Sequence, residues 1–161
     1  MVNKTLVIDP KLCTGCRLCE LVCSFKKTET YNPARARIRT IVFEDEIAFV
    51  PMTCWQCEEP VCQEVCPTGA VMRDEGTGAV TISVERCIGC KMCMMVCPFG
   101  NIQSDGSGEL VVKCDLCGGD PECVVFCPTK ALQYLPADKF TLARKKRIAG
   151  KFRSILEEVE W

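Results

Sequence analysis

Sixteen of the 161 residues are cysteine, and their spacing constrains the fold more than any other feature of the chain. Every cysteine falls into one of four groups of four, each with C-x2-C at its start and three residues before its last cysteine. The middle gap is two residues in groups one and three, four in group two and five in group four. This is a fourfold internal repeat of a metal-binding unit. The groups are Cys13, Cys16, Cys19 and Cys23; Cys54, Cys57, Cys62 and Cys66; Cys87, Cys90, Cys93 and Cys97; and Cys114, Cys117, Cys123 and Cys127.

The third group has the spacing of an iron-sulfur ligand run. It reads C-x2-C-x2-C-x3-C-P, in which three cysteines hold one 4Fe-4S cube and the fourth ligates a second cube. Zinc is the main alternative, because paired C-x2-C units also build zinc sites with four thiolate ligands. Zinc usually takes two pairs separated by a longer loop, so the repeated spacing favours four 4Fe-4S clusters.

The N-terminal residues bear on the compartment of the chain. Eight disulfides would require an oxidising compartment, but no apolar leader precedes the strand-like segment KTLVID. No run of about eighteen apolar residues predicts a membrane helix. The sequence therefore predicts reduced thiols and a cytoplasmic location.

Residues between the ligands predict the local path of each group. Gly15 and Gly89 lie inside C-T-G-C and C-I-G-C, where the lack of a side chain allows close approach of the main chain to the sulfurs. Pro98 is expected to end a helical turn, so that Cys97 reaches the neighbouring cube. Cys23 is followed by Ser24 instead of proline, and the path of the first group is expected to differ.

Short strands are expected between the groups. Residues 38–51, 70–83 and 101–112 each read as a hairpin with a polar or glycine-rich turn. The predicted fold class is α+β, with small β-hairpins and short helices around metal-binding loops. An amphipathic helix is predicted over 138–161, and it is expected to pack on its own modules or on a partner.

The order of the groups resembles the four-cluster electron-transfer subunits that accompany molybdenum and tungsten oxidoreductases, over about residues 4–136. It looks most like the small iron-sulfur subunit of tungsten-containing aldehyde oxidoreductase, although partners of carbon monoxide dehydrogenase, hydrogenase and formate dehydrogenase are similar. The resemblance implies two bacterial-ferredoxin-like dicluster modules, one inserted in the other. The outer module would comprise 1–47 and 104–137, and the inner module 48–103.

The resemblance also implies crossed ligand sets within each module. In the outer module, one cube would be bound by Cys13, Cys16, Cys19 and Cys127, and the other by Cys114, Cys117, Cys123 and Cys23. In the inner module, the sets would be Cys54, Cys57, Cys62 and Cys97, and Cys87, Cys90, Cys93 and Cys66.

The residue inventory predicts an electron carrier instead of an enzyme. The chain has no histidine and no cysteine outside the four groups, so the commonest general base and a free thiol nucleophile are both missing. The basic run at 144–147 is too isolated to predict nucleic-acid binding. A freely diffusing polyferredoxin remains an alternative to a subunit of a complex.

The resemblance implies several partners. It implies a large tungsten- or molybdenum-containing catalytic subunit, and a flavin-containing NAD-linked subunit or a ferredoxin as the second electron carrier. Contact with further copies of the chain in a larger assembly would be compatible with this role.

Overall fold

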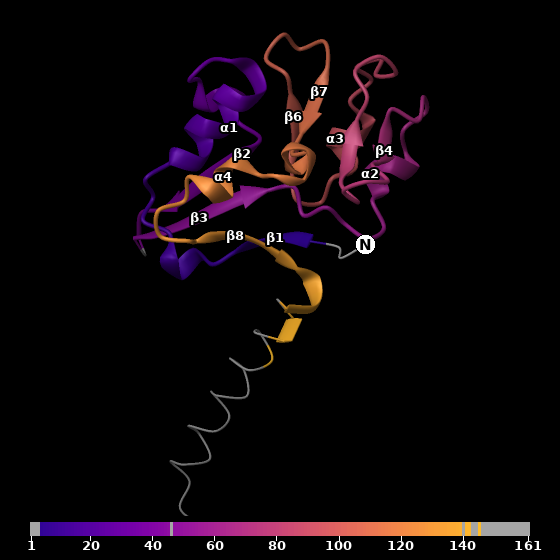
Figure 1. Cartoon of the computed structure of the whole chain (residues 1–161). Helices are drawn as coiled ribbons and strands as arrows, with labels where there is room; N and C mark the ends of the chain where they lie inside the picture. The colour runs from indigo at the N-terminus through magenta and orange to yellow at the C-terminus, as the bar shows by residue number, and fades with distance from the viewer. Residues whose placement is uncertain (1–3, 46, 140, 143–144, 146–161) are drawn as a thin grey trace, which may run out of the picture.

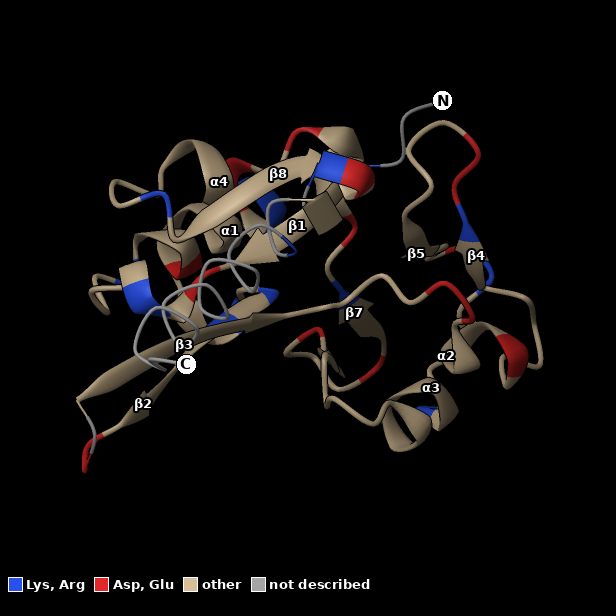
Figure 2. Ribbon diagram, turned by 90° about the horizontal axis from the view of Figure 1, so that it is seen from below, with Lys and Arg blue, Asp and Glu red and all other residues tan. Residues whose placement is uncertain are grey.

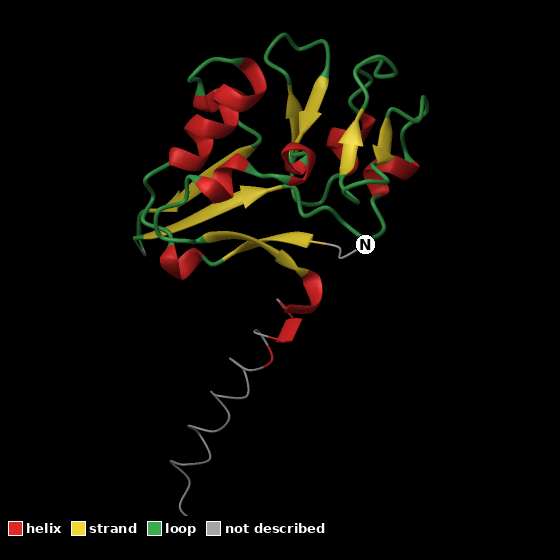
Figure 3. Ribbon diagram, in the orientation of Figure 1, coloured by secondary structure: helices red, strands yellow, loops and turns green. Residues whose placement is uncertain are grey.

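The computed structural model describes residues 4–45, 47–139, 141–142 and 145. Its strands form four two-stranded antiparallel sheets, and short helices lie beside them (Figures 1 and 3). Seen from below, acidic and basic residues are scattered over the ribbon among longer uncharged stretches (Figure 2). The predicted α+β class with small hairpins is confirmed.

Three of the sheets are hairpins between neighbouring cysteine groups, as the sequence predicts. Short polar side chains close two of the turns. Asp74 Oδ1 accepts a hydrogen bond from Thr77 N at 2.7 Å, and Asp105 Oδ1 accepts one from Ser107 N at 3.0 Å. The hairpins pair β2 (Ile38–Phe43) with β3 (Ala48–Thr53), β4 (Val71–Arg73) with β5 (Val80–Ile82), and β6 (Ile102–Ser104) with β7 (Val111–Lys113).

The fourth sheet joins segments far apart in the sequence. Strand β1 (Lys4–Ile8) pairs with β8 (Leu132–Pro136). Helix α1 (Leu18–Thr28) also packs against α4 (Glu122–Val125). Groups one and four therefore lie side by side, whereas α2 (Val61–Glu64) contacts α3 (Met92–Val96) beside β4 and β5 (Figure 1).

The Cys-Pro pairs decide where the helices end. A proline disfavours helical geometry at the residue before it, and Cys97 is extended, with φ −69° and ψ 110°. Helix α3 consequently ends after five residues. Ser24 follows Cys23 in α1, and that helix continues for eleven residues to Thr28. The prediction of a different path in the first group is confirmed.

Two small clusters of buried side chains form the core. The larger lies among β1, α1, α4 and β8, and the smaller among β4–β7 and α3. The larger contains Leu6, Cys19, Cys23, Ala36, Ile38, Ala79, Leu116, Cys123, Cys127, Ala131 and Leu132, and the smaller Val71, Val80, Cys93, Ile102 and Val111.

The predicted module boundaries do not coincide with the ends of the hairpins. The boundary at 47/48 falls between β2 and β3, and the one at 103/104 falls inside β6. Of the predicted C-terminal helix over 138–161, residues 138, 139, 141, 142 and 145 are helical. The rest of this prediction lies outside the described residues. No helix in the described part of the chain is long and apolar enough to cross a membrane.

Candidate metal centres

Four cavities lie among the cysteine groups, and each is lined by four of the sixteen cysteines. We name them cavities I to IV. Their lining cysteines are Cys13, Cys16, Cys19 and Cys127 in cavity I; Cys23, Cys114, Cys117 and Cys123 in cavity II; Cys54, Cys57, Cys62 and Cys97 in cavity III; and Cys66, Cys87, Cys90 and Cys93 in cavity IV.

Each cavity combines three cysteines of one group with the fourth cysteine of another. In cavity III, for example, Cys97 from the end of α3 lies with the first three cysteines of group two. The structure thus brings together the same four residues as each ligand set that the resemblance implies.

The order of the cavities follows from which cysteines lie close enough to affect each other's pKa. Burial raises the pKa of the Cys114 thiol to about 11, and Cys54 of cavity III adds to the rise. Burial also raises the pKa of Cys123 in cavity II, with a contribution from Cys19 of cavity I. In cavity IV, burial raises the pKa of Cys93, and Cys62 of cavity III contributes. The cavities therefore follow one another in the order I, II, III, IV.

The raised pKa values indicate that these thiols would ionise together only with a cation bound between them. Four sulfurs gathered around one cavity, of which some are buried, are hard to ionise together unless a cation neutralises them, because burial and mutual repulsion both disfavour the thiolates. A bound metal removes this penalty, since coordination deprotonates the thiol outright. The residues around each cavity therefore fit an all-thiolate metal centre.

A multi-iron cluster fits this arrangement better than one zinc ion. A tetrahedral zinc site would hold four sulfurs about 2.3 Å from a single ion. Among the described residues, no three cysteine, aspartate or glutamate side chains are grouped to hold one metal ion. In a cube, each cysteine binds a different iron atom, so the sulfurs stand further apart.

The residue before the second cysteine has a positive φ in every group. The angle is 71° at Gly15, 51° at Gln56, 66° at Gly89 and 55° at Leu116. The C-x2-C turn thus requires a left-handed residue, which costs a non-glycine residue about 1–2 kcal/mol. These four residues occupy the same position when the groups are aligned. Only two of them are glycine, so the sequence indicated the left-handed conformation in two groups and not in the other two.

Space around the turn explains where glycine is needed. An ideal Cβ at Gly15 would lie 2.6 Å from the Phe49 ring, and one at Gly89 would lie 2.0 Å from the Glu109 carbonyl oxygen. One reason for glycine at these positions, inferred from the sequence, is the close approach of the main chain to the sulfurs. The structure adds a second reason, because a side chain would collide with Phe49 or Glu109. Gln56 is held by its side-chain amide, which donates to the Cys114 carbonyl at 2.8 Å and accepts from Val80 N at 2.8 Å.

We expect Gly89→Ala to destabilise the protein far more than Gly100→Ala. Gly100 has a similar φ of 61°, but nothing lies within 4 Å of its ideal Cβ. Gly100→Ala should cost about 1–2 kcal/mol for the left-handed conformation. Gly89→Ala should cost about 1–3 kcal/mol more, because Glu109 main chain must move. Thermal loss of the visible cluster absorption measures both, and equal midpoints would contradict the steric argument.

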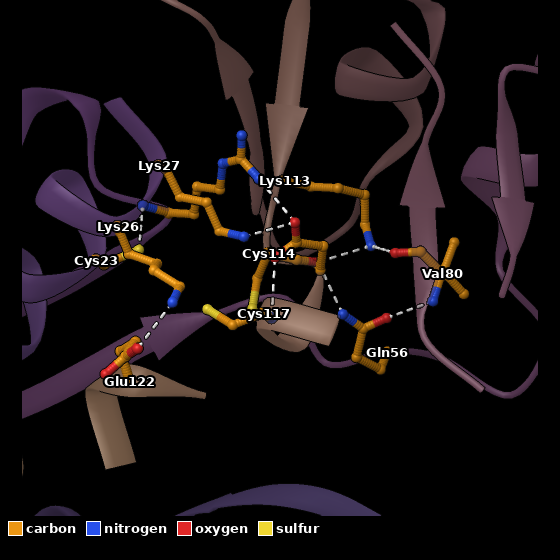
Figure 4. A network of polar contacts seen from close by, with 11 residues as sticks. Cys23, Lys26, Lys27, Gln56, Val80, Lys113, Cys114, Cys117 and Glu122 are labelled. Atoms are coloured by element: carbon orange, nitrogen blue, oxygen red, sulfur yellow. Dashed lines mark hydrogen bonds and ion pairs between the residues drawn. The ribbon is translucent and has the colours of Figure 1, made fainter. Parts of the chain in front are cut away.

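Charged side chains surround cavity II. Asp115 Oδ2 accepts hydrogen bonds from Lys27 Nζ at 2.8 Å and Arg37 Nη1 at 3.2 Å (Figure 4). Burial opposes ionisation of Asp115, but the bond from Lys27 and the nearby positive charges hold the pKa of its carboxyl below the usual value. The main-chain N–H of Arg37 also donates to Cys23 Sγ at 3.3 Å. Of the alternating arginines before and in β2, Arg37 thus lines a cavity, whereas Arg35 and Arg39 are exposed.

The segment that carries groups two and three begins and ends at the same place, beside cavity II. Thr53, the last residue of β3, and Cys114, the first residue after β7, both line cavity II. Gln56 Nε2 donates to the Cys114 carbonyl across this junction. Neither Gln56 nor its neighbour in the junction, Lys113, was predicted from the sequence to belong to the site, because no metal-ligating residue type marks them.

Two family models match the chain, and both are described as a 4Fe-4S dicluster domain. One covers residues 45–136, which is more than half of the chain, and the other covers residues 12–70. Between them they include all sixteen cysteines.

Several curated proteins are related to the chain. It is 44% identical over 93 residues to the "aliphatic sulfonate oxidoreductase, polyferredoxin-like subunit" of Pyrococcus furiosus, covering 58% of this chain and 53% of that protein. It is 37% identical to the "putative electron transport protein YsaA" of Escherichia coli, covering 63% of this chain and 67% of that protein. It is 36% identical to the "electron transport protein HydN" of the same species, covering 63% and 60%. The matches thus span about half to two thirds of the length of these relatives.

Among solved structures, the chain is similar to one chain of the active site complex BamBC of benzoyl coenzyme A reductase in complex with 1,5 dienoyl-CoA. The identity is 26% and the TM-score 0.49, covering 81% of this chain and 74% of that chain. With its sixteen cysteines in four cavities and a dicluster model matched over more than half of its length, the chain belongs to the 4Fe-4S dicluster domain family.

Proposed function

We propose that the chain carries four 4Fe-4S clusters and relays single electrons between the catalytic subunit of an oxidoreductase and a second electron carrier. The observation that carries the proposal is the row of four cavities, each lined by four cysteines. Each set of lining cysteines would hold one cluster. The clusters supply one-electron chemistry over a range of roughly −700 to +450 mV, which hydrogen bonds and solvent exposure tune.

The exposure of the cysteines supports transfer along the row. Cys16 and Cys90 are exposed, and the other fourteen are buried or half-buried. Cys16 lines cavity I and Cys90 lines cavity IV, so the exposed thiols stand at the two ends. Electrons would enter at one end cavity and leave at the other.

A nested division of the chain accounts for the crossed sets. The outer module would contain cavities I and II, closed by the pairing of β1 with β8. The inner module would contain cavities III and IV, with its own small core. Because 47/48 and 103/104 fall within hairpins, we place the boundaries after Thr53 and after Lys113.

For the partner, we propose the catalytic subunit of a tungsten- or molybdenum-containing oxidoreductase, with an aldehyde oxidoreductase as the first candidate. This rests on the order and middle gaps of the four cysteine groups. The second electron carrier would be a flavin-containing NAD-linked subunit or a ferredoxin. The C-terminal segment 138–161 would dock on the catalytic subunit.

A second candidate follows from the names of the relatives. One of them is the "formate hydrogenlyase subunit 2" of Escherichia coli, 36% identical over 102 residues and matched over 48% of its length. An electron-transfer subunit of a hydrogenase or formate dehydrogenase complex would use the same row of clusters. A freely diffusing polyferredoxin would use it as well.

Anaerobic purification from the native host tests the proposal. We expect about sixteen iron and sixteen sulfide per chain, because sixteen cysteines form four ligand sets. We also expect the chain to co-elute with a much larger catalytic chain, whose bound tungsten, molybdenum or nickel identifies the partner. Stoichiometric zinc would overturn the cofactor assignment, and elution as a single small chain would favour the free polyferredoxin.

A further inference from the structure

Lys113 is a buried cation at the junction of cavities II and III. It is the last residue of β7 and only 3% of its surface is exposed. Its Nζ donates hydrogen bonds to two main-chain carbonyls, those of Val80 and Cys114 (Figure 4). Within the described part of the chain, the ion pairs join Lys26 to Glu122 and both Lys27 and Arg37 to Asp115, and none includes Lys113.

The surroundings of Lys113 hold its side chain in place. Gln56 bonds to the main chain of the same two residues, accepting from Val80 N and donating to the Cys114 carbonyl. A lysine ammonium has three donors and no acceptor, so two carbonyls satisfy two of its donors but leave its charge without a carboxylate. A buried charge of this kind is costly unless an opposite charge lies nearby.

Cavity III supplies that opposite charge. Lys113 lines the cavity together with Cys54, Cys57, Cys62 and Cys97, so its buried ammonium faces the place where four thiolates would gather. A cube with four thiolate ligands is an anion, and it becomes more negative when it accepts an electron. The ammonium therefore favours the reduced form.

Basic residues also line the other cavities, but their fields are weaker. Arg17 at cavity I and Lys91 at cavity IV are exposed, so water and salt screen them. Lys27 and Arg37 at cavity II share the carboxylate of Asp115. Lys113 is buried and pairs with no carboxylate in the described part of the chain, whereas Glu59, the acidic residue that lines cavity III, is exposed to solvent. The effective dielectric constant around a buried charge is low.

We propose that Lys113 raises the reduction potential of the cluster in cavity III above that of the other three, so that electrons collect at the junction between the two modules. Lys113 would not bind iron. It would act on the cluster only through the electric field of its charge. The inference rests on the proposed function, since it requires a cluster in cavity III.

Redox titration followed by electron paramagnetic resonance tests the inference on the full chain. We expect Lys113→Met and Lys113→Gln to shift the reduction equilibrium of one cluster at least tenfold towards the oxidised form, which is 59 mV for a one-electron couple. Lys113→Arg keeps the charge and should restore the native potential. Arg39→Met makes the same change in net charge at an exposed position of β2 and should leave all four potentials unchanged.

The affected cluster is identified by comparison with Cys57→Ser, which alters a lining residue of cavity III. Unchanged potentials in both neutral variants, or a shift confined to another cluster, would overturn the inference. Loss of clusters in both neutral variants would assign Lys113 a role in assembly and would overturn it equally. The iron content of the native chain separates these outcomes from a failure of the proposed function, because fewer than four clusters in that chain would refute the function first.

Discussion

Removal of iron is expected to abolish the folded state of this protein. The buried apolar residues are small aliphatic side chains and five cysteines, and no Phe, Tyr, Trp or Met is buried among the described residues. The five buried cysteines are Cys19, Cys23, Cys93, Cys123 and Cys127. Both core clusters therefore contain cysteines of the proposed ligand sets, and an empty centre would leave a cavity beside the core together with thiols that lack their cation. Loss of the clusters should cost the whole net stability, which is about 5–15 kcal/mol for a domain of ordinary size.

Chelation under anaerobic conditions measures this effect. We expect the iron-free chain to lose its near-ultraviolet circular dichroism and to show no cooperative thermal transition. Reconstitution with iron and sulfide should restore both signals, which controls for chemical damage to the thiols. A cooperative transition in the iron-free chain at the native midpoint would show that the hairpins and their side chains suffice.

The second large effect is expected from Cys97→Ser, and it should appear in the cluster of group two rather than in that of Cys97's own group. Cys97 lines cavity III with Cys54, Cys57 and Cys62, whereas the other cysteines of its group line cavity IV. A serine oxygen is a poor substitute for a thiolate at iron. We therefore expect loss or spectral change of one cluster out of four, with up to about four of sixteen iron atoms lost.

Two reference variants decide which cluster changes. Cys57→Ser alters cavity III and Cys90→Ser alters cavity IV, and each gives a reference paramagnetic resonance spectrum. The spectrum of Cys97→Ser should resemble that of Cys57→Ser. Cys66→Ser is the reciprocal case, because Cys66 lines cavity IV, and its spectrum should resemble that of Cys90→Ser. The opposite correspondence in either pair would mean that each group binds its own cluster.

Much of this architecture could be predicted because its causes are local. The alternation of strand residues and turn signals predicted all three hairpins. The proline after Cys97 predicted the end of α3, and the absence of one after Cys23 predicted a different path for α1. Such signals lie within a few residues of the feature that they determine.

Features that depend on contacts between distant residues could not be read in this way. Gln56 takes a left-handed conformation that glycine would favour, because its amide bonds to Val80 and Cys114. Nothing in the local sequence distinguishes Lys113 from an exposed lysine of a strand. It is buried because β5 packs beside it and the Val80 carbonyl accepts a hydrogen bond from its Nζ. The predicted boundaries at 47/48 and 103/104 fall within hairpins, because the spacing between cysteines does not record which strands pair.

The junction at Thr53 and Cys114 bears on how such a chain could arise. Residues on either side of an inserted unit need to be close together, because the host then closes without strain and the insert adds little loop entropy. Thr53 and Cys114 meet that condition at cavity II, and residues 54–113 leave and return there. The outer unit would then be an ancestral two-cluster protein that received a second copy of itself. A single insertion would in this way add two clusters to the electron-transfer path. The outer unit would keep the pairing of β1 with β8, which joins its first and last strands.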